Sequence, residues 1–179
     1  MKLRTAVFLT FALGVGVVPG AFAEADRHVS VHDGGGSIGV QWHLPKDLTF
    51  GAHVTTSSGD ALAGACKSGG CSLTIDGDVA DVAEAIALLE GNEIQTATVT
   101  AGYRMELPED VTAVLSLALH WYHEQPRSPQ PGVELRLLRS QFLAYASWHD
   151  LDLEGYTPIA GRAIHIRGEV VRVGLGFRF

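Results

Sequence analysis

A serine and a histidine two positions apart could carry nucleophilic chemistry in this sequence. Ser147 and His149 fall on one face of an expected strand, and Asp150, Asp152 and Glu154 follow them. A serine hydrolase needs a base within reach of the hydroxyl and an acid that orients the base. The simpler interpretation is a strand end entering a loop, so we expect no catalytic site and keep this pair as the alternative.

Eight histidines also invite a metal-site interpretation. His43, His53 and His120 fall on the polar faces of expected strands. The ligand spacing typical of zinc sites is absent. The acidic residues within 76–81 depart from the calcium-loop pattern of EF-hands. We therefore expect no metal and no cofactor, and we expect the three histidines to form hydrogen bonds inside the fold.

The first 23 residues have the anatomy of a secretory signal peptide. Lys2 and Arg4 precede an apolar run over residues 5–18, and Ala21-Phe22-Ala23 forms a cleavage site. We expect cleavage after residue 23, which leaves residues 24–179 as one domain.

A secreted chain enters an oxidising compartment, where two nearby cysteines are expected to form a disulfide. Cys66 and Cys71 lie five positions apart in a glycine-rich segment. A disulfide between them is the expectation, in preference to a metal or redox role.

Charge and hydropathy exclude several classes of protein. The chain of 179 residues has a net charge of −7, and removal of Lys2 and Arg4 takes it to −9. Such an acidic chain is a poor partner for nucleic acid or for an anionic membrane surface. No segment after residue 23 has the roughly 18 consecutive apolar residues of a transmembrane helix. A closed β-barrel would be the remaining way to cross a membrane.

Alternating apolar and polar residues predict β-strands along most of the chain. In residues 111–122, for example, Leu115 and Leu117 share a face, whereas Ser116 and His120 share the other. The same pattern predicts strands at 27–32, 36–44, 48–55, 95–104, 111–122 and, as one or two strands, at 133–147. Eight strands fit the length.

The connections between these strands differ in kind. Leu-Pro-Lys-Asp at 44–47 and Leu-Pro-Glu-Asp at 107–110 predict tight turns on one side of a meander, with chance similarity as the alternative. Residues 56–93 predict a long loop with a helix over 79–90, capped by Asp78 and ended by Gly91. The three prolines within 124–132 predict a loop, and 150–161 predict another.

Residues 171–179 end the chain on an aromatic residue, with apolar residues at every second position before it. These residues are Val171, Val173, Leu175, Phe177 and Phe179. The segment resembles the closing strand of Gram-negative outer-membrane β-barrels, and the chain length is similar to the eight-stranded opacity-protein and OmpX-like group. The resemblance implies an all-β, antiparallel up-and-down transmembrane barrel. It also implies an outer-membrane location, recognition by the barrel-assembly machinery, and contact with lipids and lipopolysaccharide.

Alternation alone leaves open which face points outward, because a soluble periplasmic barrel or sandwich has the same period with the faces reversed. The terminal Phe179 and the small polar face favour the membrane barrel. The aromatic residues near strand ends are expected in aromatic girdles, namely Trp42, Tyr103, Trp121, Phe177 and Phe179. Arg104, Arg172 and Arg178 fall on polar faces and are expected in the lumen, whereas His165 and Arg167 break the pattern unless a bulge near Gly168 resets it.

The expected function follows from this fold. We expect a monomeric, non-enzymatic barrel whose lumen is filled by side chains. External loops, chiefly 56–93, would act in adhesion or envelope integrity. The alternatives are an outer-membrane hydrolase of lipid A or phospholipid and a narrow, porin-like pore.

Overall fold

The protein folds into one all-β sheet. The computed structural model describes residues 24–32, 34–59, 71–75, 78–79, 93–122, 125–156 and 164–179. Its ten strands are β1 (Glu24–His32), β2 (Gly35–His43), β3 (Leu48–Ser58), β4 (Cys71–Ile75), β5 (Asp78–Val79), β6 (Glu93–Leu107), β7 (Val111–Tyr122), β8 (Gln125–Arg139), β9 (Phe142–Tyr156) and β10 (Ile164–Arg178). A 3-10 turn, η1 (Pro45–Asp47), joins β2 to β3. None of the helical segments in these ranges has the length and apolar character needed to cross a membrane.

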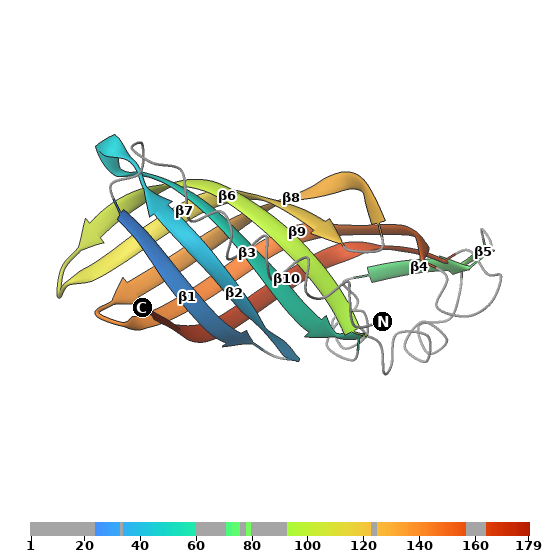
Figure 1. The fold of residues 1–179 in the computed structure, drawn as a ribbon. Coiled ribbons are helices and arrows are strands. Elements are labelled where there is room, and N and C mark those ends of the chain that lie inside the picture. The colour runs from blue at the N-terminus through green and yellow to red at the C-terminus, as the bar shows by residue number, and fades with distance from the viewer. Residues whose placement is uncertain are drawn as a thin grey trace, which may run out of the picture.

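Eight of the strands close into an antiparallel barrel, as the sequence predicts (Figure 1). The order around the wall is β1-β2-β3-β6-β7-β8-β9-β10, and β10 pairs back onto β1. The seam between first and last strand includes two backbone hydrogen bonds, from the Arg27 amide to the Phe179 carbonyl at 3.2 Å and in return at 2.9 Å. Closure pairs backbone groups that lipid could not satisfy.

The strands are staggered around the barrel. Following Cα partners from Asp26 through each neighbouring strand leads to Val170 on β10. Because Arg178 is the partner of His28, the position opposite Asp26 lies two residues beyond Arg178, and Val170 is ten residues away from that position along β10. A stagger of this kind accompanies the tilt of the strands to the barrel axis, which is plain in Figure 1.

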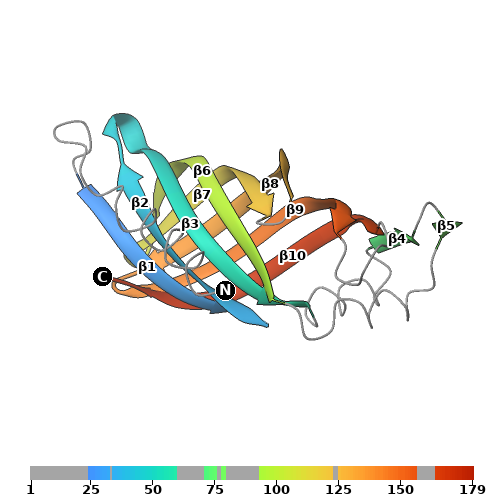
Figure 2. The ribbon, with the colours of Figure 1, turned by 45° about the vertical axis from the view of Figure 1, so that its right-hand side comes forward.

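The stagger also extends β10 past β1. β1 pairs with the last part of β10, from Gly174 to Arg178, whereas the first part, from Ile164 to Gly168, pairs with β4. Strands β4 and β5 therefore continue the sheet beyond the barrel wall, at the end opposite the C-terminus (Figure 2).

Both predicted Pro-containing turns are confirmed, and they lie at the same end of the barrel, called the turn end below. Lys46 and Asp47 have φ of 65° and 61°, and Glu109 and Asp110 have 65° and 57°. Two consecutive left-handed residues match the twist of a hairpin. The turn end also holds Phe179 and a third tight turn between β8 and β9, where Ser140 has φ of 53°. That turn carries no Pro-Asp signal, so the sequence did not locate it.

The prediction of an irregular loop over 124–132 was wrong. β8 begins at Gln125, and within this stretch Gln125 and residues 130–132 pair with β7, with a register shift between His120 and Tyr122. The pairing of β8 with β9 begins only at Gly132. Pro131 is therefore paired on one side only, residues 126–129 have no ladder partner among the described strands, and prolines are tolerated at such positions.

Two other boundaries differ from the sequence predictions. β9 runs to Tyr156, through much of the loop predicted over 150–161, and residues 157–161 lie outside the described part. The bulge expected near Gly168 lies between Ile164 and His165. Asp78, predicted to cap a helix, lies with Val79 in β5, and the rest of the predicted helix falls outside the described residues.

Candidate functional site: a filled lumen inside a lipid-facing wall

The two faces of the wall differ in exposure in the way a membrane barrel requires. Outward positions carry exposed apolar side chains, such as Leu117 at 72% and Leu175 at 66% exposure. Inward positions carry buried polar side chains, such as Thr96 and His149, both at 0%. Apolar side chains outside and polar ones inside suit acyl chains around a closed lumen. The prediction that the apolar face points outward is confirmed.

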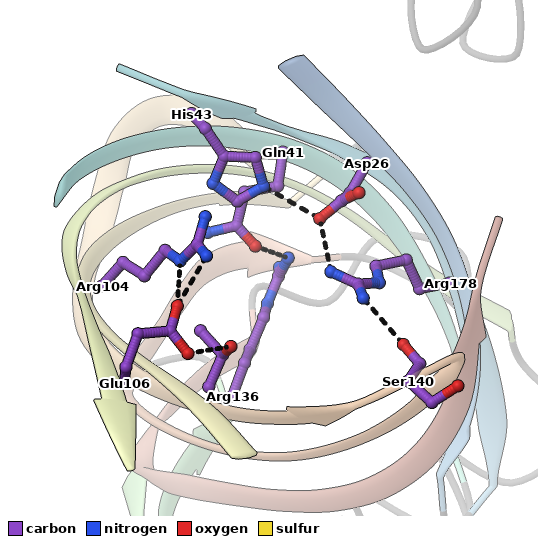
Figure 3. A network of polar contacts seen from close by, with 9 residues as sticks. Asp26, Gln41, His43, Arg104, Glu106, Arg136, Ser140 and Arg178 are labelled. Atoms are coloured by element: carbon purple, nitrogen blue, oxygen red, sulfur yellow. Dashed lines mark hydrogen bonds and ion pairs between the residues drawn. The ribbon is translucent and has the colours of Figure 1, made fainter. Parts of the chain in front are cut away.

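An arginine crosses the middle of the lumen. Arg136 of β8 donates from Nη1 to Gln41 Oε1 at 3.3 Å and from Nη2 to His53 Nδ1 at 3.0 Å. In the ring of eight strands, β2, which carries Gln41, lies opposite β8. Figure 3 shows the Arg136 side chain extending between the walls to Gln41. The arginine therefore links opposite walls and occupies the space between them.

The charge of Arg136 is balanced on its own strand. Its Nε donates to Glu134 Oε1, and both side chains are almost fully buried. Because arginine can only donate, His53 Nδ1 must accept, which leaves the ring proton on Nε2. That atom lies 3.5 Å from the second Glu134 oxygen. Each charge of the buried pair thus has further polar contacts, which offset part of the desolvation penalty.

A second polar network joins the seam at the turn end (Figure 3). Asp26 Oδ2 on β1 lies 2.8 Å from His43 Nε2 on β2 and 3.1 Å from Arg178 Nη1 on β10. Arg178 Nη2 donates to the Ser140 carbonyl oxygen at 2.8 Å. Side chains therefore tie the first strand, the last strand and the β8–β9 turn together where the barrel closes.

A third group at this end is more exposed. Arg104 Nε donates to Glu106 Oε1 at 2.8 Å, and Thr112 donates to the other carboxylate oxygen at 2.9 Å. The two charged side chains are 35% and 58% exposed. Water screens such a pair, so it adds little stability. Arg104 and Arg178 occupy polar faces at the lumen rim, as predicted.

An apolar cluster lies between the centre of the lumen and the turn end. Val114, Leu138 and Leu143 are buried against one another, and Tyr145 packs on them. The sequence analysis missed this cluster. A signal was present, because Val114 interrupts the polar side of the alternation in β7 and Leu138 does so in β8.

Histidines fill the lumen toward the other end. The rings of His120 and His149 stack with centroids 4.2 Å apart. Thr98 Oγ1 lies 2.9 Å from His120 Nδ1, and Tyr122 Oη lies 2.5 Å from His149 Nε2. Gly132 makes room for the stack, since a Cβ there would lie 2.7 Å from His149 Cβ. His43, His53 and His120 are all hydrogen-bonded inside the barrel, as expected.

The alternative catalytic pair, Ser147 and His149, shares the inner face of β9. Both side chains are buried, at 5% and 0% exposure. The His149 Nε2 atom contacts Tyr122, and Ser147 lies in register between Glu134 and Arg172. Arg172 occupies an inward position, as predicted. A hydrolytic role for the pair stays a prediction.

The remaining predicted residues fall on the outside or beyond the described part. Val171, Val173, Leu175, Phe177 and Phe179 occupy the outward face at the end of the chain and are 58–69% exposed. Their role as an assembly signal stays a prediction. Cys71 opens β4, and Cys66 lies outside the described residues, so the disulfide also stays a prediction.

The expected aromatic girdle is confirmed for some of its members. Tyr103, Phe177 and Phe179 are exposed on the outer wall at 49%, 58% and 69%. Trp42, in contrast, is 5% exposed, and its ring stacks on Phe50 with centroids 5.7 Å apart. Trp42 shares the outward face of β2 and β3 with Phe50, its Cα partner.

His165 and Arg167 lie on the outward side of β10, at the end away from the turns. Asp152 of β9 lies 2.6 Å from His165 Nε2 and 3.4 Å from Arg167 Nε. Nearby, the Trp148 indole donates to Glu169 at 3.2 Å. These charged side chains lie on the outer wall, and the apolar surface of β9 and β10 therefore ends at this level, on the side away from the turn end.

Comparison with known proteins gives structural likenesses of low sequence identity. No family model matches the sequence, and no curated protein matches it. The chain is similar to the de novo designed TMB2.3, with 8% identity and a TM-score of 0.42 over 90% of this chain and 98% of that one. It is also similar to Ail, an outer membrane protein of Yersinia pestis, in a phospholipid bilayer nanodisc (13% identity, TM-score 0.40, 87% and 100% covered). Ail in complex with the heparin analogue sucrose octasulfate gives 12% identity and a TM-score of 0.32 over 87% and 94%.

The barrel itself carries the assignment of fold and location. It is closed, it has eight antiparallel strands, and its outer wall is apolar. Closed barrels with an outward apolar band and short turns at one end span the outer membranes of bacteria. The chain has the fold of a small outer-membrane β-barrel and belongs in the outer membrane of a Gram-negative bacterium.

Proposed function

We propose that this chain is a sealed, non-enzymatic outer-membrane barrel that acts through its external loops in adhesion or envelope integrity. The observation that carries this proposal is the Arg136 side chain, which crosses the lumen and bonds to Gln41 and His53 on the far side. An eight-stranded barrel is just wide enough for side chains to fill its interior. The lumen therefore favours a structural role over transport.

The position of the long connection supports an external site of action. The turns at one end are short, which is the periplasmic arrangement in outer-membrane barrels. The β3–β6 connection, residues 59–92, leaves and re-enters the barrel at the other end, between the Cα partners Ser58 and Glu93. This is the chain's longest connection between neighbouring barrel strands, and on this placement it faces the outside of the cell.

A loop-replacement experiment tests the external role. Because Ser58 and Glu93 face each other, an Asn-Gly turn in place of residues 59–92 can rejoin β3 to β6. The matched control replaces Pro108–Asp110 with Asn-Gly between Leu107 and Val111, which are also partners. Heat-modifiable gel mobility verifies that both variants fold.

The readouts are attachment of whole cells to host-cell monolayers and survival in detergent. We expect the 59–92 replacement to lose attachment or detergent resistance, and the turn-end control to retain both. Wild-type attachment and resistance in the folded loop variant would refute the proposed external role.

A separate measurement tests the sealed lumen. In planar bilayers, the purified wild-type barrel should give no steady conductance, because Arg136, Glu134 and the apolar cluster fill the passage. Reproducible conductance steps of the wild type would contradict a sealed lumen and favour the narrow-pore alternative.

A further inference from the structure

A hollow on the lipid-facing wall lies near the turn end. Its volume is about 480 Å³, and most of its lining residues occupy outward positions of β8, β9 and β10, while Leu138 and Leu143 of the lumen cluster also line it. Ala144 lines it on β9, with the lining residues Leu137 and Leu175 as Cα partners on either side. Because alanine is much smaller than its two neighbours, the wall is indented there.

Aromatic side chains bound the hollow toward the turn end. Phe142 and Phe177 are cross-strand partners with ring centroids 5.3 Å apart, and both are more than half exposed. Val31 of β1 lines the hollow on the far side of the seam. The volume lies within the roughly 300–1,000 Å³ of ordinary ligand sites, and the lining is chiefly hydrocarbon.

Among the described residues, Arg139 is the charged residue that lines this hollow. Arg139 is the last residue of β8, next to the tight turn, and its side chain is exposed. No carboxylate among the described residues forms an ion pair with it. A cation at the membrane boundary beside an apolar hollow matches the two parts of an anionic lipid, the phosphate and the acyl chain.

We propose that this hollow binds an acyl chain of an anionic phospholipid of the periplasmic leaflet, with the lipid phosphate paired to Arg139. The turn end faces the periplasm in barrels of this kind, and it therefore meets the phospholipid leaflet. A second copy of the chain would present another convex wall and would leave the indentation at Ala144 empty. A flexible acyl chain can fill it. The inference does not depend on what the external loops do.

Lipid retention measured by native mass spectrometry tests the proposal. The full-length mature barrel is placed in nanodiscs of equal amounts of phosphatidylglycerol and phosphatidylethanolamine, then released into detergent. Two variants address the two halves of the site, Arg139→Gln for the phosphate and Ala144→Phe for the acyl chain. Matched controls on the opposite wall are Lys46→Gln in the β2–β3 turn and Ala52→Phe on β3.

The wild type and both controls should retain one phosphatidylglycerol in preference to phosphatidylethanolamine. Arg139→Gln should lower that preference about five-fold, which corresponds to about 1 kcal/mol for one basic residue near an anionic surface. Ala144→Phe should lower retention of both lipids. Heat-modifiable mobility confirms that each variant is folded.

Two outcomes would overturn the inference. Equal lipid retention by the wild type, Arg139→Gln and Ala144→Phe would show that the hollow selects no lipid. A bound second copy of the chain that Ala144→Phe disrupts would show that the hollow is a protein interface.

Discussion

Replacing Arg136 by methionine tests the central feature of the lumen. Arg136→Met keeps most of the length of the side chain but removes its charge and all of its hydrogen bonds. Glu134, at 2% exposure, would then retain His53 Nε2 at 3.5 Å as its closest recorded polar contact. The variant therefore leaves a carboxylate buried in the lumen without its cation.

The expected destabilisation is large. Removing one partner of a buried ion pair costs about 3–5 kcal/mol, because the remaining charge stays desolvated. The exposed pair at the rim is the matched control, since Arg104 and Glu106 are 35% and 58% exposed. Arg104→Met should cost less than about 1 kcal/mol.

The assay is urea unfolding of the barrel in phospholipid vesicles, followed by tryptophan fluorescence. A double-mutant cycle with Glu134→Gln isolates the interaction between the two charges. We expect the double variant to recover about 2–3 kcal/mol relative to the sum of the single variants. If Arg136→Met were no more damaging than Arg104→Met, the pair would not be desolvated and the sealed-lumen argument would fail.

Three further predictions concern the wall, the packing of the lumen and the seam. Leu117→Arg places a charge where the side chain is 72% exposed, and should lower unfolding free energy in vesicles by about 2–4 kcal/mol; no loss would mean that this face is outside the bilayer. Gly132→Ala puts a Cβ 2.6 Å from the Trp148 carbonyl oxygen and should lower the free energy of unfolding by about 1–3 kcal/mol. The folded band on a heat-modifiable gel should then be lost at a lower temperature, and loss at the wild-type temperature would contradict the close packing. Asp26→Asn weakens the pair with Arg178 and should cost about 1–2 kcal/mol and speed unfolding in urea; an unchanged unfolding rate would show that the seam contact is not limiting.

Local pattern was sufficient for several elements of the fold. The predicted strand over 111–122 agrees with β7 at both ends, because apolar residues recur at every second position between a Pro-Asp turn and a polar segment. The two turns at 44–47 and 107–110 were predicted from proline and aspartate, and they have matching left-handed residues. These features depend on interactions between residues close in sequence.

Strand β8 shows where the local argument failed. Prolines within 124–132 predicted a loop because proline removes a ladder donor. In the barrel, Gln125 and residues 130–132 pair with β7, whereas pairing with β9 starts only at Gly132. Whether a proline is tolerated depends on which side has a neighbour, and the stagger of distant strands decides that.

The filled lumen was predictable in kind but not in its contacts. Glu134 and Arg136 alternate with leucines, so their inward position follows from the period of two. Their partners do not, because Arg136 bonds to Gln41 and His53, which lie 95 and 83 positions away. The hollow at Ala144 was likewise invisible in the sequence, since it depends on the larger residues on the two neighbouring strands.

The sequence by itself determined that this chain forms alternating strands with one apolar face, because side chains in a strand point to opposite sides in turn. Only the tertiary structure decided which face is outside. Closure of β10 onto β1 turns the polar face inward, where Arg136 can reach the opposite wall, and leaves the apolar face to the lipid. The physical reason is that strand period is a local property of the backbone, whereas curvature, closure and contacts across a lumen arise when all eight strands pair together.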